Sequence, residues 1–230
     1  MCLDSGFFGA INITFSIHIN CEGHIAQSGY NYNTVNIGPA DTVVLNGIDI
    51  DHRGFPGTIP ALAFTGSGTL YLHNSTIRGT STGLSFTPNN TAKLFITNTK
   101  IDNNSGFGVT IQPTVGRSSV NIDGLSATGN KGGVLAAALG NAGASIQLEM
   151  RNSNLSQNAD FGLFSGGVTL PIVTVIDNSV ISNNANVGVK SNGSNSQVFI
   201  SNSTISGNKI GWIFSTGVSF SATEIIMSQT

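Results

Sequence analysis

The chain repeats one pattern of apolar and polar residues seven times. Each repeat has a central Asn or Gly, with an apolar residue two positions before it and another three positions after it, as Ile200 and Ile205 flank Asn202. The central residues lie 24 to 28 positions apart, at Gly47, Asn74, Asn98, Gly124, Asn152, Asn178 and Asn202. A unit of this length cannot close a core alone, so the period predicts a solenoid of stacked units.

Within a repeat, apolar and polar residues alternate, as in the segments 94–97 and 146–150. A period of two indicates β-strands, and each repeat has room for three short strands separated by turns. The segment 11–20 alternates in the same way, so we expect a strand there and no helix capping the first coil. We predict one domain over residues 1–230, with N-terminal coils lacking an obvious cap at 1–42, regular repeats at 43–217 and a C-terminal end at 218–230.

Asn and Gly recur where the strands must turn. Asn tolerates left-handed backbone angles and Gly adopts them freely, so these residues are expected at corners. Stacked Asn side chains can also hydrogen-bond along the solenoid axis as a ladder. A neighbouring row predicts a second polar ladder at the same corner: Ser75, Thr99, Ser153, Ser179 and Ser203.

The pattern I-x-N-S-x-I-S-x-N-x-x-x-G-V resembles the repeat of right-handed parallel β-helix proteins of the pectin-lyase-like superfold. The resemblance covers roughly residues 40–217, and the N-terminal part is similar to bacterial β-helix repeat proteins of unassigned function. It implies an all-β, right-handed parallel β-helix of about seven to nine coils, with three short strands per coil. The superfold includes lyases, hydrolases, epimerases, tailspikes, adhesins and scaffolds, so the resemblance does not choose an activity.

The composition limits which binding partners and which cellular compartment are expected for the protein. Only 9% of the residues are charged and the net charge is −2, so no basic patch for nucleic acid or an anionic membrane is expected. No apolar run is long enough for a membrane span, and no signal peptide is visible at the N-terminus. Cys2 and Cys21 fit either one disulfide or two buried thiols. We expect an extracellular or cell-surface location.

A cluster of five charged residues falls on one predicted face, at Asp49, Asp51, Arg78, Lys100 and Asp102. If the repeats stack in register, Asp51, Arg78 and Asp102 are neighbours at about 5 Å per coil. One hypothesis is a catalytic polysaccharide site. Resemblance to pectate lyases would imply Ca²⁺ held by the carboxylates with Arg or Lys as base, and a pair of carboxylates could instead hydrolyse a glycoside. The favoured interpretation is a solvated ladder of alternating charges.

Later coils predict an uncharged outward row at Thr128, Ser156, Ser182 and Ser206. This row could suit sugar hydroxyls, although ordinary strand surface is favoured. Trp212 replaces an apolar corner residue of the other coils, so it is expected in the core or at its end.

These patterns predict a β-solenoid that is a carbohydrate-interacting or structural module, with polysaccharide as the candidate partner. A polysaccharide lyase or glycoside hydrolase is one alternative, and a segment of a fibre or adhesin is another. Whether the protein is an enzyme is left open. Because open sheet edges invite association, homo-oligomers through uncapped solenoid ends are also expected.

Overall fold

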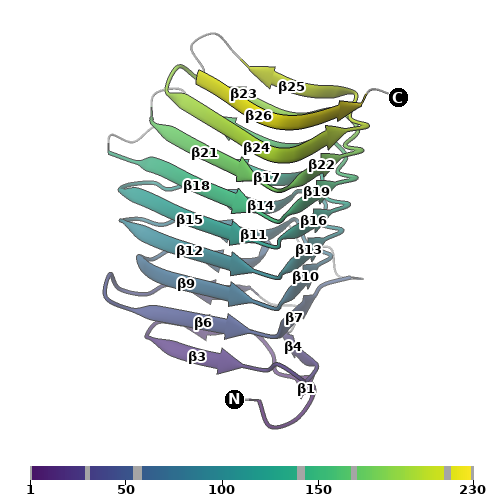
Figure 1. Cartoon of the computed structure of the whole chain (residues 1–230). Coiled ribbons are helices and arrows are strands. Elements are labelled where there is room, and N and C mark those ends of the chain that lie inside the picture. Colours follow the sequence, from purple (N-terminus) through teal and green to yellow (C-terminus); the bar gives the residue numbers. More distant parts are fainter. Residues whose placement is uncertain are drawn as a thin grey trace.

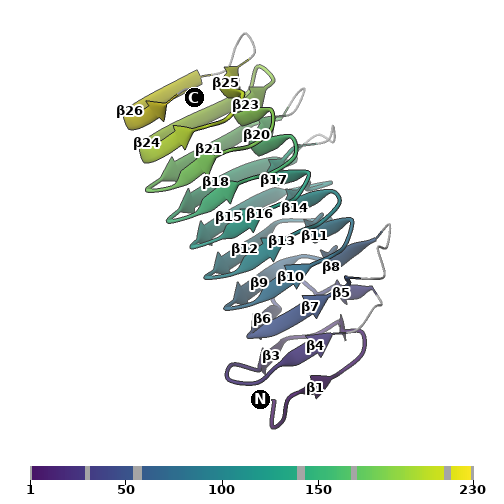
Figure 2. The same cartoon turned by 90° about the vertical axis from the view of Figure 1, so that its right-hand side faces the viewer.

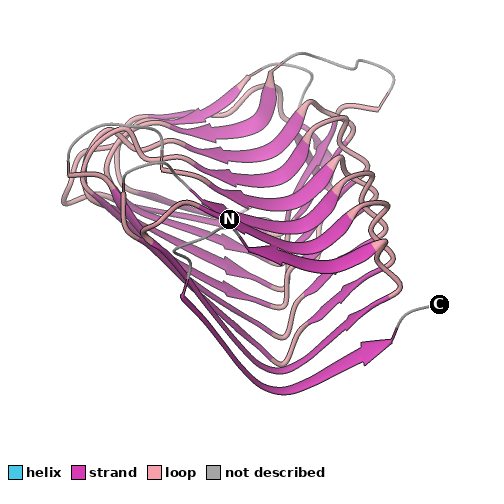
Figure 3. Cartoon of the chain, turned by 90° about the horizontal axis from the view of Figure 1, so that it is seen from above, coloured by secondary structure: helices cyan, strands magenta, loops and turns pink. Residues whose placement is uncertain are grey.

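The computed structural model describes residues 2–28, 32–53, 59–138, 143–166, 170–214 and 219–228, the last range by its backbone alone. Its strands run parallel to their neighbours and stack into a solenoid (Figures 1 and 2). Seen along the axis, the coils have three faces separated by corners and loops (Figure 3). Turns that contribute a strand to each of the three faces run from β3–β5 through β24–β25, which makes eight successive turns in the described part of the chain. The predicted parallel β-solenoid is confirmed.

Each face is a ladder of strands from successive coils. Face 1 consists of β3 (Ile17–Asn20), β6 (Thr42–Asn46), β9 (Gly68–His73), β12 (Ala92–Thr97), β15 (Arg117–Asp123), β18 (Ser145–Arg151), β21 (Ile172–Asp177), β24 (Ser196–Ser206) and β26 (Ser219–Ser228). Face 2 consists of β1 (Gly6–Phe7), β4 (Ala26–Ser28), β7 (Ile48–Asp51), β10 (Thr76–Arg78), β13 (Lys100–Asp102), β16 (Ser126–Thr128), β19 (Asn154–Ser156) and β22 (Val180–Ser182). Strands β24 and β26 run through the corner and join faces 1 and 2 into one 17-stranded sheet.

Face 3 is a separate nine-stranded sheet that closes the coil. It consists of β2 (Asn12–Ile13), β5 (Asn33–Val35), β8 (Pro60–Phe64), β11 (Thr82–Phe86), β14 (Phe107–Ile111), β17 (Gly132–Ala136), β20 (Phe161–Gly166), β23 (Val187–Asn192) and β25 (Ile210–Phe214).

The core lies between the three faces and is built from rows of identical positions. Ile50, Ile77 and Ile101 are register partners on face 2, and each is fully buried. Leu72 and Ile96 stack in the same way on face 1. Every apolar row therefore covers the next coil, and truncating one such Ile or Leu to Ala should cost about 2–5 kcal/mol. At the far end Trp212 is half-buried against the core, as predicted, with its ring 6.2 Å from that of Phe214.

The corner between faces 1 and 2 uses the repeated Asn and Gly. The φ angles of Asn74, Asn98, Asn152, Asn178 and Asn202 lie between 44° and 51°, and Gly47 and Gly124 have φ of 71° and 74°. Asn is among the few residues that adopt this left-handed conformation at low cost. The corner role predicted for these seven residues is confirmed.

The predicted Ser/Thr ladder runs directly beside this corner. The backbone N–H of Ser153 donates to Ser179 Oγ at 3.2 Å, and that of Ser179 donates to Ser203 Oγ at 3.1 Å. Each hydroxyl in turn donates to a carbonyl of its own coil, as Ser179 does to Asp177 O at 2.8 Å. The hydroxyls thereby satisfy buried N–H groups that the sharp turn removes from the strand ladder.

A second corner lies between faces 2 and 3, and here the left-handed residue is the one before the recurring Asn rather than that Asn itself. Its positive-φ residues are Gly79, Asn103, Gly129, Gln157, Asn183 and Gly207. The residue that follows is a buried Asn in four successive coils, with 1–2% of its surface exposed: Asn104, Asn130, Asn158 and Asn184. These side chains hydrogen-bond along the axis, for example from Asn158 Nδ2 to Asn184 Oδ1 at 2.9 Å. The main asparagine ladder lies inside this corner.

The N-terminal coil departs from the prediction of one strand over 11–20. The segment forms β2 on face 3 and β3 on face 1, with a bend at 14–16 between them. The strand prediction was wrong at this bend because alternation alone does not show where a chain leaves one face for the next. Cys2 and Cys21 form a disulfide with their Cα atoms 4.7 Å apart, which decides between the two states left open. Within the described residues, no helix is long and apolar enough to cross a membrane.

Candidate functional site

The five charged residues predicted on one face do lie together on face 2. Asp51 pairs in register with Arg78, and Arg78 with Asp102; Asp49 and Lys100 both pair with Thr76. Neighbouring strands of a sheet are about 4.8 Å apart, so Arg78 stands between Asp51 and Asp102 in the strand order of face 2. We call these five residues the charged cluster.

Two arginines hold the acidic side of the charged cluster. Arg53 is the second residue after β7, and its Nη2 lies 2.6 Å from Asp51 Oδ2 while its Nε lies 3.0 Å from Asp51 Oδ1. Arg78 Nε lies 2.9 Å from Asp51 Oδ2, and Arg78 Nη2 lies 3.1 Å from both carboxylate oxygens of Asp49. Charge-assisted, bidentate contacts of this kind fix both partners in place.

These contacts set the protonation state of Asp51. Hydrogen bonds from Arg53, joined by the charge of Arg78, hold the pKa of the Asp51 carboxyl well below its usual range despite partial burial. A general acid or base works best when its pKa lies near the operating pH. Asp51 is therefore a permanent carboxylate with its lone pairs engaged, and it is poorly suited to move protons.

The third carboxylate is more deeply placed. Asp102 has 6% of its surface exposed; its Oδ2 lies 3.2 Å from Lys100 Nζ and accepts a 2.7 Å hydrogen bond from Asn103 Nδ2. Its Oδ1 is buried and has no hydrogen-bond partner within the described part of the chain. A buried carboxylate oxygen without a donor costs stability. Asp49 Oδ1 is likewise buried without a hydrogen-bond partner among the described residues, although it forms an ion pair with Arg78.

A shallow hollow of about 290 Å³ opens beside the charged cluster. It is lined by Phe7, Gln27, Asp51 and Arg53, which come from β1, β4, β7 and the residue pair after β7. Phe7, Gln27 and Asp49 are successive register partners on face 2. The sequence pattern did not reveal Phe7 and Gln27, because the first coils do not follow the repeat, and Arg53 was not among the predicted site residues.

The charged cluster does not fit the Ca²⁺ that resemblance to pectate lyases would imply. Ca²⁺ takes six to eight oxygen ligands, whereas Asp49 and Asp51 already pair with Arg78 and Arg53, and Asp102 pairs with Lys100. Among the described residues, no group of three or more His, Cys, Asp or Glu side chains is arranged to hold a metal ion.

Two other groups of outward-pointing side chains lie outside the charged cluster. Thr128, Ser156, Ser182 and Ser206 do form the predicted register row, yet only 8% of Ser156 and 9% of Ser182 is exposed. These short side chains lie between coils on either side, so little of their surface reaches solvent and the row offers few hydroxyls to a ligand. On face 1 the rings of Tyr71 and Phe95 stack with centroids 4.6 Å apart, so each covers a face of the other.

Comparison with known proteins agrees with this architecture. A family model described as the right handed beta helix region matches residues 60–226, which is more than half of the chain. A comparison with curated proteins and a comparison with solved structures each found no match to the chain. The matched range contains the regular turns from β8 onward, including Arg78, Lys100 and Asp102 of the charged cluster. The chain therefore belongs to the right-handed β-helix family.

Proposed function

We propose that this protein is a non-catalytic carbohydrate-binding module, which holds a polysaccharide against face 2 without cleaving it. The observation that carries the proposal is the pairing of its carboxylates: Asp51 is held by Arg53 and Arg78, and Asp49 by Arg78. Acid–base cleavage of a glycan needs a carboxyl group able to exchange a proton. Fixed ion pairs instead offer a rigid pattern of donors and acceptors for hydroxyl groups.

The hollow beside Asp51 supplies the contacts that such a module needs. Gln27 contributes an amide that can both donate and accept hydrogen bonds. Arg53, whose side chain is 64% exposed, contributes a guanidinium. The ring of Phe7 lies at the edge of the same hollow. An apolar surface with a few fixed polar groups is the usual make-up of a sugar-sized site.

The test is a glycan array followed by affinity electrophoresis in polysaccharide gels, with Ca²⁺ and with chelator. Gln27→Ala should weaken retention about five- to thirty-fold, since it removes one or two hydrogen bonds of about 1 kcal/mol each. Gln197→Ala is the matched control, because Gln197 is an exposed amide on face 1. Binding should not depend on Ca²⁺. Wild-type protein that retains no glycan, or two variants that lose retention equally, would reject the proposal.

Polysaccharide cleavage is the second candidate, and Asp102 favours it. The buried, unsatisfied Oδ1 of Asp102 is the kind of strained polar atom found at functional sites. Assays for new reducing ends and for unsaturated products would detect hydrolysis and elimination respectively. If the wild type cleaves a polysaccharide and a folded Asp102→Asn variant does not, the function is catalysis rather than binding.

We place the protein in an oxidising compartment, at the cell surface or outside the cell. The Cys2–Cys21 disulfide supports this location, because such bonds persist where thiols are not kept reduced. Alkylation of cells before lysis, followed by mass spectrometry of the Cys2 peptide, tests it. Recovery of both cysteines as free thiols would contradict the location.

A further inference from the structure

An apolar pocket of about 220 Å³ opens at the N-terminal end of the core. Its floor is formed by Cys21, Ala26 and Ile48, which have 1–3% of their surfaces exposed. Its walls include the half-buried Ile11 and Ile19, which also pack against the core. The remaining lining residues are Cys2, Phe8, Gln27 and Ser28.

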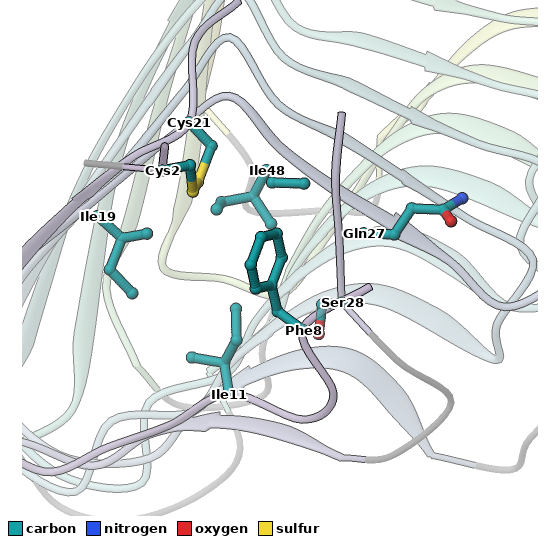
Figure 4. A pocket seen from close by; sticks show the side chains of 9 residues that line it. Cys2, Phe8, Ile11, Ile19, Cys21, Gln27, Ser28 and Ile48 are labelled. Carbon is teal, nitrogen blue, oxygen red and sulfur yellow. A yellow bond between two sulfur atoms is a disulfide. The ribbon is translucent and has the colours of Figure 1, made fainter. Parts of the chain in front are cut away.

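The polar residues of the lining are turned away or already satisfied. The side chain of Gln27 points away from the pocket in Figure 4. Ser28 Oγ donates to Gly9 O at 2.9 Å and lies 2.5 Å from Asn33 Oδ1. The lining includes no charged residue. A charged or strongly polar ligand would lose its hydration there without finding partners.

The ring of Phe8 lies between Ile11 and Ile48 at the centre of the pocket (Figure 4). Phe8 is 57% exposed, so the pocket covers only part of it. The next residue, Gly9, has φ of 74° and open space around its Cα. Gly9 has no side chain that would crowd the ring of Phe8, so the ring is left partly over the pocket and partly in solvent.

The segment carrying Phe8 is fastened at both ends. Cys2 is bonded to Cys21 on the pocket floor, and its N–H donates to Asn20 O at 2.7 Å. Phe8 N–H donates to Gln27 O at 2.8 Å. The disulfide and these hydrogen bonds hold the segment at the N-terminal end of the core, with the side chain of Phe8 more than half exposed.

We propose that this pocket binds a small, uncharged, apolar molecule of about the size of a single aromatic ring, with Phe8 closing over it. A cavity of about 150 Å³ lined by aliphatic and aromatic side chains suffices to bind benzene. The pocket here is larger and equally apolar. A second copy of the chain fits it less well, because the disulfide-held segment crosses the end of the core and a flat partner surface would meet that segment first (Figure 1).

The experiment measures the effect of benzene on the melting temperature of the disulfide-bonded protein, with ligand-observed NMR as a second readout. Benzoate is the matched probe that carries a charge. Ala26→Ile fills the floor of the pocket. Phe8→Ala removes the closing ring, and Phe15→Ala is its control because Phe15 is 61% exposed and does not line the pocket.

We expect benzene, and not benzoate, to raise the melting temperature of wild type and of Phe15→Ala. Ala26→Ile should abolish the response, and Phe8→Ala should weaken binding about two- to ten-fold, the usual worth of an aromatic contact. No response in wild type, or equal responses in Phe8→Ala and Phe15→Ala, would overturn the proposal even if Ala26→Ile failed to fold. So would sedimentation showing a dimer that Phe8→Ala dissociates, since a second copy would then cover the pocket.

Discussion

The buried asparagine ladder makes a sharp prediction for Asn158→Ala. Asn158 Nδ2 donates to Asn184 Oδ1 at 2.9 Å and to Ala127 O at 3.1 Å, and its Oδ1 accepts from Asn130 N at 3.0 Å. Each net hydrogen bond is worth about 1 kcal/mol, and the buried backbone groups left without partners add to the loss. The variant should therefore lose about 3–4 kcal/mol of unfolding free energy.

The control for this prediction lies four residues earlier in the same coil. Asn154 is exposed on β19 and its side chain makes no hydrogen bond within the described residues, so Asn154→Ala should change stability by less than about 0.5 kcal/mol. Equilibrium denaturation in guanidinium chloride, followed by circular dichroism, compares the two variants. If Asn158→Ala loses no more stability than Asn154→Ala, the ladder does not hold the coils together as argued.

Three further predictions concern the charges, the corner and the disulfide. Because Arg53 holds the pKa of Asp51 below its unfolded value, Asp51 stabilises the fold above about pH 4, and this effect is lost as the pH falls. Asp51→Asn should therefore lower the unfolding free energy by about 1–2 kcal/mol at pH 7, and the loss should shrink when denaturation is measured at lower pH. Asn178→Val should destabilise by at least about 1 kcal/mol more than Asn178→Gly, since φ of 44° penalises a branched side chain; equal melting temperatures would contradict this. Reducing the Cys2–Cys21 disulfide should cost up to about 3 kcal/mol, given the 19-residue separation it spans, and a melt unchanged by reductant would contradict this.

Most of the fold could be predicted because the repeat fixes both register and corners. Asn at 74, 98 and 178 marked left-handed turns, and a period of two then placed Ile77 and Ile101 inside the core. Aligning these rows in the sequence was then enough to predict Asp51 and Asp102 as the register neighbours of Arg78.

The remainder depended on contacts that no local pattern carries. Gln157 adopts φ of 57° at the second corner, although Gln has no special tendency to do so, because the stacked coils impose the turn. Arg53 reaches back to Asp51 by a side-chain rotation that the sequence does not encode. Phe7 and Gln27 belong to an irregular first coil, so their place beside Asp51 needed the structure.

The most direct test of the account is a carbon-13 NMR titration of the Asp51 carboxyl, assigned by comparison with Asp51→Asn. The account predicts that Asp51 remains ionised far below the usual range for aspartate, because Arg53 and Arg78 engage both of its oxygens. Face 2 would then be a fixed ion-paired surface suited to binding. A carboxyl that titrates at or above the ordinary pKa of aspartate would contradict the account, and would make the charged cluster a candidate for acid–base catalysis.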